Sequence, residues 1–306
     1  MPNTSASAQL PEPGALTLDH VAHFVPDSDA ASAALEKLGF TLTPFSHQSH
    51  RLHEGAPLVP AGTGNRCVML ERGYLEFLTP TADTPIAGQL RSAIERYVGI
   101  HLIAFGSSAP ELDHARLTAN GFEPLEPVAL QRPISTESGE ATARFTVVRV
   151  SPGAMPEGRI QFCQHHTPDL VWQPRWLRHR NGALGLSGVL VCVEDPEEAA
   201  QRYSRYTGRP STSDGRARHI RTARGALTFV DSATLARVLG LSAPSLPWIA
   251  GYALETSDPG ATRDVVLGAA VNVIDVPGSR FAATLPPAVG GVVIFERPGS
   301  GPLRFQ

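Results

Sequence analysis

Three histidines lie close together in a polar stretch and have a spacing that resembles a metal-binding cluster: His47, His50 and His53. A polar loop of this composition is more typical of a solvated flap beside a binding site than of an ordered metal centre. A flap that closes over a site can still supply one side chain as an acid or a base. We therefore expect a flap, with His53 as a candidate for contact with a substrate.

A glycine-punctuated segment, GTGNRC at residues 62–67, directly precedes an expected strand. It is not a phosphate-binding loop, because it lacks the GK[ST] ending and no helix follows it. Asn65 and Arg66 are candidates to hold an acidic or carbonyl group of a substrate. The alternative is an ordinary turn with an exposed arginine.

A third candidate is the run HHTPDLVWQPRW at residues 165–176. His166 and Trp172 could form an imidazole and aromatic wall for a small molecule. The alternative is a linker that is anchored by buried tryptophans. Nucleophilic catalysis has little support, because no GxSxG elbow is present and the cysteines, Cys67, Cys163 and Cys192, read as buried free thiols in a reducing cytoplasm.

The composition excludes several kinds of partner. The 306 residues carry a formal net charge of −3 and are 42% hydrophobic. This balance gives no general attraction for nucleic acid, and no stretch approaches the ~20 apolar residues of a membrane span. Residues 1–14 are neither basic nor apolar enough for a secretory signal and are expected to be a disordered leader. We expect a cytoplasmic protein with a small-molecule substrate, and a homodimer as a possible assembly.

The elements that must position these candidates occur as a repeat. The order strand, helix, then further strands begins at Leu16, and it begins again at Gly99, at Leu186 and at Trp248. In the first copy, LTLDHVAHFVPD reads as a strand that ends in a helix cap, SDAASAALEKLGF as a helix, and RCVMLER and GYLEFLTP as strands. Residues 82–98 have helical spacing and are expected to link the first two copies.

Four such units predict an α+β fold of four βαβββ modules. One module leaves a half-covered sheet with exposed edges, so the modules should pair. We expect an N-terminal domain at residues 15–180 and a C-terminal domain at residues 181–306.

The segments LDHVAHFVPD, LGF, GTGNRCVMLERGYLEFLTP and HHTPDLVW resemble the vicinal oxygen chelate superfamily, and within it the glyoxalase-like domain proteins. The resemblance is sharp over residues 16–80, fair over 99–172 and only topological beyond 185. It implies that paired modules curl into two curved, cup-like mixed sheets. It also implies metal-assisted isomerase, lyase or oxygenase chemistry on a small oxygen-rich molecule, or metal-free binding of such a molecule, as in the resistance-type members.

The resemblance places the metal ligands on the first and last strand of each module. Those positions fall on His20 and Glu76, 56 residues apart, and on His101 and Gln161, 60 residues apart. Two imidazoles and a carboxylate suit Zn, Fe, Ni, Co or Mn with positions left open for substrate. Gln161 departs from the usual carboxylate and cannot act as a base, so Glu76 is the candidate general base.

The same alignment places Gly188, Gly251 and Ile294 at the corresponding positions of the C-terminal half. That half has therefore lost the ligand set, which argues against an extradiol dioxygenase, because those enzymes keep their iron in the second half. Two alternatives to a metal-dependent enzyme remain. One is a metal-free binding protein in which the histidines are hydrogen-bonded pocket walls, and the other is a scaffold without activity.

Overall fold

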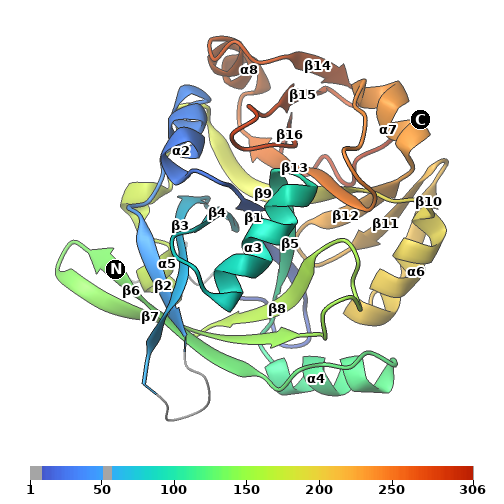
Figure 1. Cartoon of the computed structure of the whole chain (residues 1–306). Coiled ribbons are helices and arrows are strands. Elements are labelled where there is room, and N and C mark those ends of the chain that lie inside the picture. Colours follow the sequence, from blue (N-terminus) through green and yellow to red (C-terminus); the bar gives the residue numbers. More distant parts are fainter. Residues whose placement is uncertain (1–8, 51–56, 306) are drawn as a thin grey trace.

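The computed structural model describes residues 9–50 and 57–305. Four successions of strand, helix and three strands follow one another along the chain, as expected (Figure 1). The first consists of β1 (Thr17–Phe24), α2 (Ser28–Lys37), β2 (Ser46–His50), β3 (Val59–Met69) and β4 (Tyr74–Pro80). The second consists of β5 (Gly99–Gly106), α4 (Pro110–Ala119), β6 (Val128–Thr136), β7 (Gly139–Arg149) and β8 (Arg159–His165).

The C-terminal half repeats the order. The third succession consists of β9 (Ala183–Cys192), α6 (Pro196–Thr207), β10 (Ser211–Asp214), β11 (Ala217–Arg221) and β12 (Ala226–Val230). The fourth consists of β13 (Trp248–Thr256), α8 (Pro259–Leu267), β14 (Val273–Val276), β15 (Arg280–Thr284) and β16 (Val292–Glu296). The connections contain α3 (Pro85–Arg96), α5 (Pro168–Val171), a 3₁₀ turn at Pro174–Trp176 and α7 (Ser232–Leu239).

Local sequence explains where the module helices begin. Asp27, Asp195 and Asp258 each stand at the N-cap, where the carboxylate accepts hydrogen bonds from backbone N–H groups of the first turn. Such a cap satisfies donors that have no partner within the helix. Pro196 and Pro259 occupy the first helical position, where a missing N–H costs nothing.

In each unit the first strand pairs in parallel with the last, as β1 does with β4 and β5 with β8. The first strands of successive units pair antiparallel, β1 with β5 and β9 with β13. All sixteen strands of the described chain belong to one mixed sheet, because β13 also pairs with β5 at Ile249 and Ile100. The expected two separate sheets are therefore joined through this contact.

Two β-bulges interrupt the β1–β5 ladder and decide which side chains share a face. Leu18 pairs with Phe105 and His20 with Ala104, so Asp19 is an extra residue on β1. On β5 the extra residue is His101, because Ala22 pairs with Leu102 and His23 with Ile100. A bulge leaves one residue unpaired and redirects the side chains beside it.

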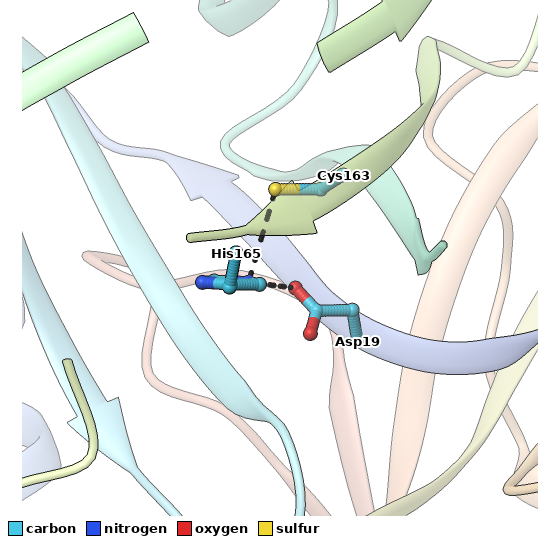
Figure 2. Close-up of side chains that lie close together, drawn as sticks. All are labelled: Asp19, Cys163 and His165. Atoms are coloured by element: carbon cyan, nitrogen blue, oxygen red, sulfur yellow. Dashed lines mark hydrogen bonds and ion pairs between the residues drawn. The ribbon is translucent and has the colours of Figure 1, made fainter. Parts of the chain in front are cut away.

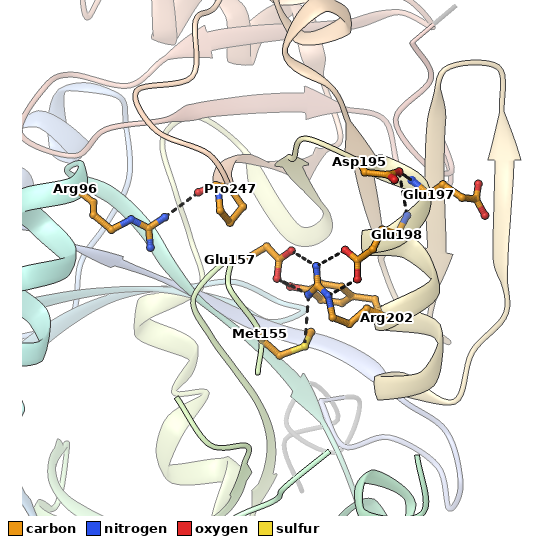
Figure 3. A network of polar contacts seen from close by, with 9 residues as sticks. Arg96, Met155, Glu157, Asp195, Glu197, Glu198, Arg202 and Pro247 are labelled. Atoms are coloured by element: carbon orange, nitrogen blue, oxygen red, sulfur yellow. Dashed lines mark hydrogen bonds and ion pairs between the residues drawn. The ribbon is translucent and has the colours of Figure 1, made fainter. Parts of the chain in front are cut away.

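The two halves share one hydrophobic core, which combines, for example, Phe105 and Phe162 with Tyr206 and Tyr252. Polar contacts also join them: Arg202 of α6 pairs with the fully buried Glu157 of the N-terminal half at 2.8 Å and with Glu198 at 2.9 Å (Figure 3). The predicted boundary near residue 180 therefore separates two sequence units whose side chains pack together.

The described chain begins inside the segment that we expected to be a disordered leader. Gln9 is buried, and its side chain accepts a hydrogen bond from the Gly73 N–H at 3.0 Å. This part of the predicted leader is therefore packed, because the Gln9 side chain satisfies a buried backbone group. Within the described residues, no helix combines the length and the hydropathy that a membrane span requires.

Candidate active site

A cavity of about 320 Å³ lies within the first two units. Its wall contains residues of both units, and the polar ones come mainly from the strands: His20, Gln48, Ser49, Tyr74, Glu76, Gln89, Gln131, Arg132, Arg149, Arg159, Gln161 and Cys163. Three of the four predicted metal ligands, His20, Glu76 and Gln161, are among them. They share a face because Ala22, two residues after His20, pairs with Glu76, and Ala104 pairs with both His20 and Gln161.

His20 is held firmly in the cavity wall. Its ring stacks on Tyr74 with 4.3 Å between the centroids, and its Nδ1 lies 2.6 Å from Asp19 Oδ2. Since a carboxylate can only accept, Nδ1 carries the proton in this contact. His20 Nε2 is then the ring nitrogen that can accept a proton from a molecule in the cavity.

Glu76 is held by amide donors. Asn65 Nδ2 donates to Glu76 Oε1, and Gln48 Nε2 lies 3.5 Å from the same oxygen. Thr63 in turn donates to Gln48 Oε1 at 2.8 Å. The predicted substrate-binding residue Asn65 is thus buried behind Glu76 and orients it, and it is not among the residues that line the cavity.

Three arginines, Arg132, Arg149 and Arg159, face the same cavity. Within the described residues, no carboxylate lies within ion-pair distance of any of them. Burial and the neighbouring Arg159 charge lower the pKa of Arg149 to about 10, and burial also lowers the pKa of Arg159. A guanidinium in this situation is stabilised by an anion.

Beside His20 lies a second group of polar side chains, which comes from the β1 bulge and from β8 (Figure 2). Asp19 Oδ2 is 3.0 Å from His165 Nε2, and His165 Nε2 is 3.7 Å from Cys163 Sγ. All three residues are buried, and Cys163 also lines the cavity.

The charge state of this group follows from its contacts. Burial alone would raise the pKa of the Asp19 carboxyl, but the charges and hydrogen bonds of His165 and His20 hold it well below its usual range. Burial raises the pKa of the Cys163 thiol well above its usual value, and the Asp19 charge adds to this. Asp19 is thus a buried carboxylate beside a protonated thiol.

His101 is not brought to the cavity, contrary to the prediction. Its Nε2 lies 2.9 Å from the Tyr97 carbonyl oxygen, and its ring stacks on Tyr97 at 4.1 Å. Burial lowers the pKa of His101 to about 4, so it is a neutral core histidine. The reason is the bulge: His101 corresponds to Asp19, and Leu102 corresponds to His20 and lines the cavity in its place.

The other predicted contacts also fall outside the cavity wall. Arg66 lies on the opposite side of β3 from Asn65, where it contacts Asp29 and the Thr43 carbonyl oxygen. His166 is exposed and bonds Thr146 Oγ1 at 2.8 Å. Trp172 is fully buried behind His165, with 4.7 Å between the ring centroids, and therefore anchors the segment, as the alternative interpretation held. His53 lies outside the described residues.

The fold and these residues can be compared with known proteins. The family model for the Glyoxalase-like domain matches residues 18–207, which include every described residue of the cavity wall. This chain is a glyoxalase-like domain protein. The match covers the first two units and the beginning of the third, so the resemblance to the vicinal oxygen chelate superfamily is confirmed.

Solved structures extend the likeness in fold to most of the chain. A hypothetical protein from Staphylococcus aureus superposes with a TM-score of 0.64 at 12% identity, over 92% of this chain and 99% of that one. A mutant of 4-hydroxymandelate synthase from Streptomyces coelicolor gives 0.60 at 16% identity, over 94% of each chain.

A fusion protein of a xylose isomerase-like TIM barrel and 4-hydroxyphenylpyruvate dioxygenase gives a TM-score of 0.57 at 13% identity, over 92% of this chain and 49% of that one. These identities establish the shared fold alone. No curated protein matches the chain by sequence.

Many glyoxalase-like proteins use a divalent metal, and the cavity residues of this chain can be tested for one. His20 and Glu76 are suitable donors. Leu102 takes the place of a third and cannot ligate, and Gln161 Oε1 already accepts a hydrogen bond from Arg149 Nε at 3.2 Å. Two strong donors are fewer than the three that open metal sites ordinarily provide. This set therefore does not fit a resident metal ion.

Sequence reasoning missed Asp19, Cys163, His165 and the cavity arginines. Alternation along β8 was a usable signal, because residues 161, 163 and 165 must share a face once Gln161 is assigned to the cavity. The same alternation places the His165 side chain on the cavity face of β8 and the His166 side chain on the opposite face. Asp19 had no such signal, because regular alternation places it opposite His20 and only the bulge reverses this.

Proposed function

We propose that this glyoxalase-like protein is an enzyme that binds a small, oxygen-rich organic anion in the cavity and moves a proton on it, as isomerases and lyases do. The observation that carries the proposal is the His20–Asp19 pair in the wall of a cavity that also contains Glu76 and three arginines. Within the described residues these arginines form no ion pair with a carboxylate. The substrate's identity is left at this chemical class.

The arginines supply the binding energy. Guanidinium groups bind carboxylates and related oxyanions through charge-assisted, often bidentate hydrogen bonds, which are about twice as strong as neutral ones. Burial and the neighbouring Arg159 disfavour the charge of Arg149, so a bound anion would offset a cost that already exists in the folded protein.

His20 and Glu76 supply the proton chemistry. Asp19 fixes the tautomer of His20 and would stabilise the imidazolium that forms when Nε2 takes a proton from carbon. Glu76, oriented by Asn65, would serve as the second proton-transferring group, and the arginines would stabilise the negative charge that develops on a substrate oxygen. No step in this scheme requires a metal ion.

A second candidate is a metal-free binding protein of the same fold. The observation that favours it is Leu102, an apolar residue at the position where a metal-dependent relative would need a ligand. Such a protein would use the same arginines for the same class of anion and would leave the bound molecule unchanged.

The experiment has two stages. Thermal-shift assays with a panel of small mono- and dicarboxylates, with and without carbonyl or hydroxyl groups, identify an anion that stabilises the folded protein. NMR in D₂O then measures exchange of the carbon-bound proton beside the acidifying group of that anion. We expect exchange in the wild type, and about 10²- to 10⁴-fold slower exchange in His20→Gln.

The exposed His166→Gln is the matched control and should exchange at the wild-type rate. Stabilisation by an anion without exchange would favour the binding protein. Equal exchange in the wild type and His20→Gln, or no stabilising anion, would contradict the proposed function. Exchange that is lost with EDTA and restored by a divalent metal would instead support the metal-dependent chemistry implied by the family.

A further inference from the structure

Three ligand-type atoms of different chemistry converge next to the cavity, at a place distinct from the positions where the family holds metal. Asp19 Oδ2, His165 Nε2 and Cys163 Sγ all lie within 4.8 Å of one another (Figure 2). The family positions, His20, Glu76, Leu102 and Gln161, contain no sulfur atom. The group of Asp19, Cys163 and His165 is called the thiol cluster below.

The spacing in the thiol cluster is close to that of a tetrahedral ion site. Zinc binds sulfur at about 2.3 Å and imidazole nitrogen or carboxylate oxygen at about 2.0–2.2 Å, so its ligand atoms lie about 3.2–3.7 Å apart. Two of the three separations are 3.0 Å from oxygen to nitrogen and 3.7 Å from nitrogen to sulfur, and the third, from oxygen to sulfur, is at most 4.8 Å. Only small side-chain movements are needed to place one ion between the three atoms.

The surroundings fix the ligands in place. The His165 ring is enclosed by Trp172, Phe145 and Tyr74, with 4.7, 5.1 and 6.2 Å between the centroids. Asp19 is held by the β1 bulge and by His20 Nδ1. Ligands whose rotamers are locked by packing and by hydrogen bonds to neighbouring side chains bind metal more tightly than mobile ones.

The cluster also has unused capacity for a cation. Asp19 is fully buried and its second oxygen, Oδ1, has no hydrogen-bond partner within the described chain. Burying a carboxylate is costly unless a compensating charge lies nearby. An ion on Oδ2 would provide that charge, and Oδ1 could then take over the hydrogen bond from His20.

We propose that Asp19, Cys163 and His165 form a binding site for one thiophilic divalent cation, with Zn²⁺ as the best match to a sulfur, nitrogen and oxygen donor set. On binding, the Cys163 thiol releases its proton to solvent and its sulfur bonds the ion as a thiolate. Three protein ligands leave one position for water or another small ligand. This inference does not depend on the proposed proton chemistry.

The test uses the full-length protein, freed of metal by chelator and dialysed against one equivalent of Zn²⁺ or Co²⁺. We expect about one Zn²⁺ per chain by elemental analysis. We also expect the Co²⁺ form to show tetrahedral d–d absorption with a near-ultraviolet thiolate-to-cobalt charge-transfer band. The charge-transfer band in the wild type is informative without any variant, because the family's metal position in this chain has no sulfur.

Cys163→Ser should abolish the charge-transfer band and lower Zn²⁺ affinity at least ten-fold. Cys67→Ser, which changes another buried thiol outside the cluster, should leave both unchanged. The proposal is overturned if the wild type takes up no metal, or if the Co²⁺ form lacks the charge-transfer band. It is also overturned if metal uptake is lost in Glu76→Gln while Cys163→Ser retains it, which would place the ion at the family position.

Discussion

The two halves of this protein share a strand scheme, yet the centre of that scheme holds a polar cavity in the N-terminal half and a buried apolar cluster in the C-terminal half. The pairings make the halves comparable position by position: Gly188 corresponds to His20, Thr228 to Glu76, Gly251 to Leu102 and Ile294 to Gln161. None of the four C-terminal residues is ionisable. Gly251 also has no room for a side chain, because a Cβ there would lie 2.1 Å from the Val292 carbonyl oxygen.

At the corresponding centre of the C-terminal half, apolar side chains pack against one another instead. Leu190, Ala253, Val292 and Ile294 belong to one buried hydrophobic cluster. The comparison shows that the strand scheme is stable whether its centre is packed with hydrocarbon or hollowed and charged. Function therefore depends on which residues occupy a few positions of an otherwise common frame.

The bulges sharpen this comparison. The N-terminal half has one on each central strand, whereas the C-terminal half has two on β9 and one on β13. The extra residues are Asp19, His101, Leu184, Ser187 and Ala250. Only Asp19 uses its position to contact a polar residue of the cavity wall, His20. The same backbone irregularity is thus structural in four places and serves the candidate site in one.

The largest expected effect is on the packed centre of the C-terminal half. Ile294 is fully buried, so Ile294→Ala should lower the free energy of unfolding by about 2–5 kcal/mol. Leu102→Ala should cost less, because one side of Leu102 already borders the cavity. Urea unfolding measures the loss of stability in both variants. Equal costs would mean that the two centres are equally well packed, which contradicts the comparison.

Lowering the pH should destabilise the fold mainly through histidines of the N-terminal half. Burial lowers the pKa of both His23 and His101 to about 4. Between about pH 6.5 and 4 the unfolded chain therefore binds protons that the folded chain does not, and the free energy of unfolding falls, by on the order of 3 kcal/mol for each histidine.

Urea midpoints across this pH range test the prediction, and His101→Gln should show a shallower dependence on pH. The low pKa of Asp19 acts in a separate window, because its contribution to stability is present above about pH 4 and is lost only in stronger acid. A stability that stayed constant from pH 7 to pH 4 would show that His23 and His101 are not kept neutral by the fold.

The arginines of the cavity should affect ligand binding without supporting the fold. Burial and the Arg159 charge disfavour the charge of Arg149. Removing that charge in Arg149→Met should therefore weaken binding of the organic anion about 10- to 100-fold and leave stability unchanged or slightly higher. Calorimetry and thermal unfolding measure the two effects. Arg237→Met in α7 of the C-terminal half is the control, and its anion affinity should equal that of the wild type.

The smallest expected effect is a gain in the affinity of the cavity for a divalent metal. Leu102→His restores an imidazole at the position that corresponds to His20, beside Glu76 and Gln161. Divalent-metal affinity of the cavity should rise by about ten-fold or more, as expected when an open site acquires its third strong donor. Titration in a Cys163→Ser background isolates this site. An unchanged metal affinity in Leu102→His would contradict the importance given to position 102.

Much of the fold could be predicted because its signals are local. The four successions, the helix caps at Asp27, Asp195 and Asp258 and the linking helix near residues 82–98 all follow from capping residues and from hydrophobic spacing. The helix α7 was not anticipated, although Asp231 caps it and Gly240 ends it in the left-handed conformation.

The site was predicted only in part, and one residue of register accounts for the main error. Counting from strand ends aligned His101 with His20, whereas hydrogen bonding aligns Leu102 with it. A shift of one residue moves a side chain to the opposite face of a strand. The same parity separates the buried His165 from the exposed His166.

The sequence by itself determined the repeat, the family and the placement of His20, Glu76 and Gln161 on one face, because periodicity, caps and motif residues are properties of short segments. The tertiary structure alone decided three further points. These are the bulge that turns Asp19 toward His20, the meeting of Asp19 with Cys163 and His165, and the position of the cavity arginines, which form no ion pair with a carboxylate of the described chain. Each depends on ladder register or on contacts between residues more than 100 positions apart, and no local pattern encodes either.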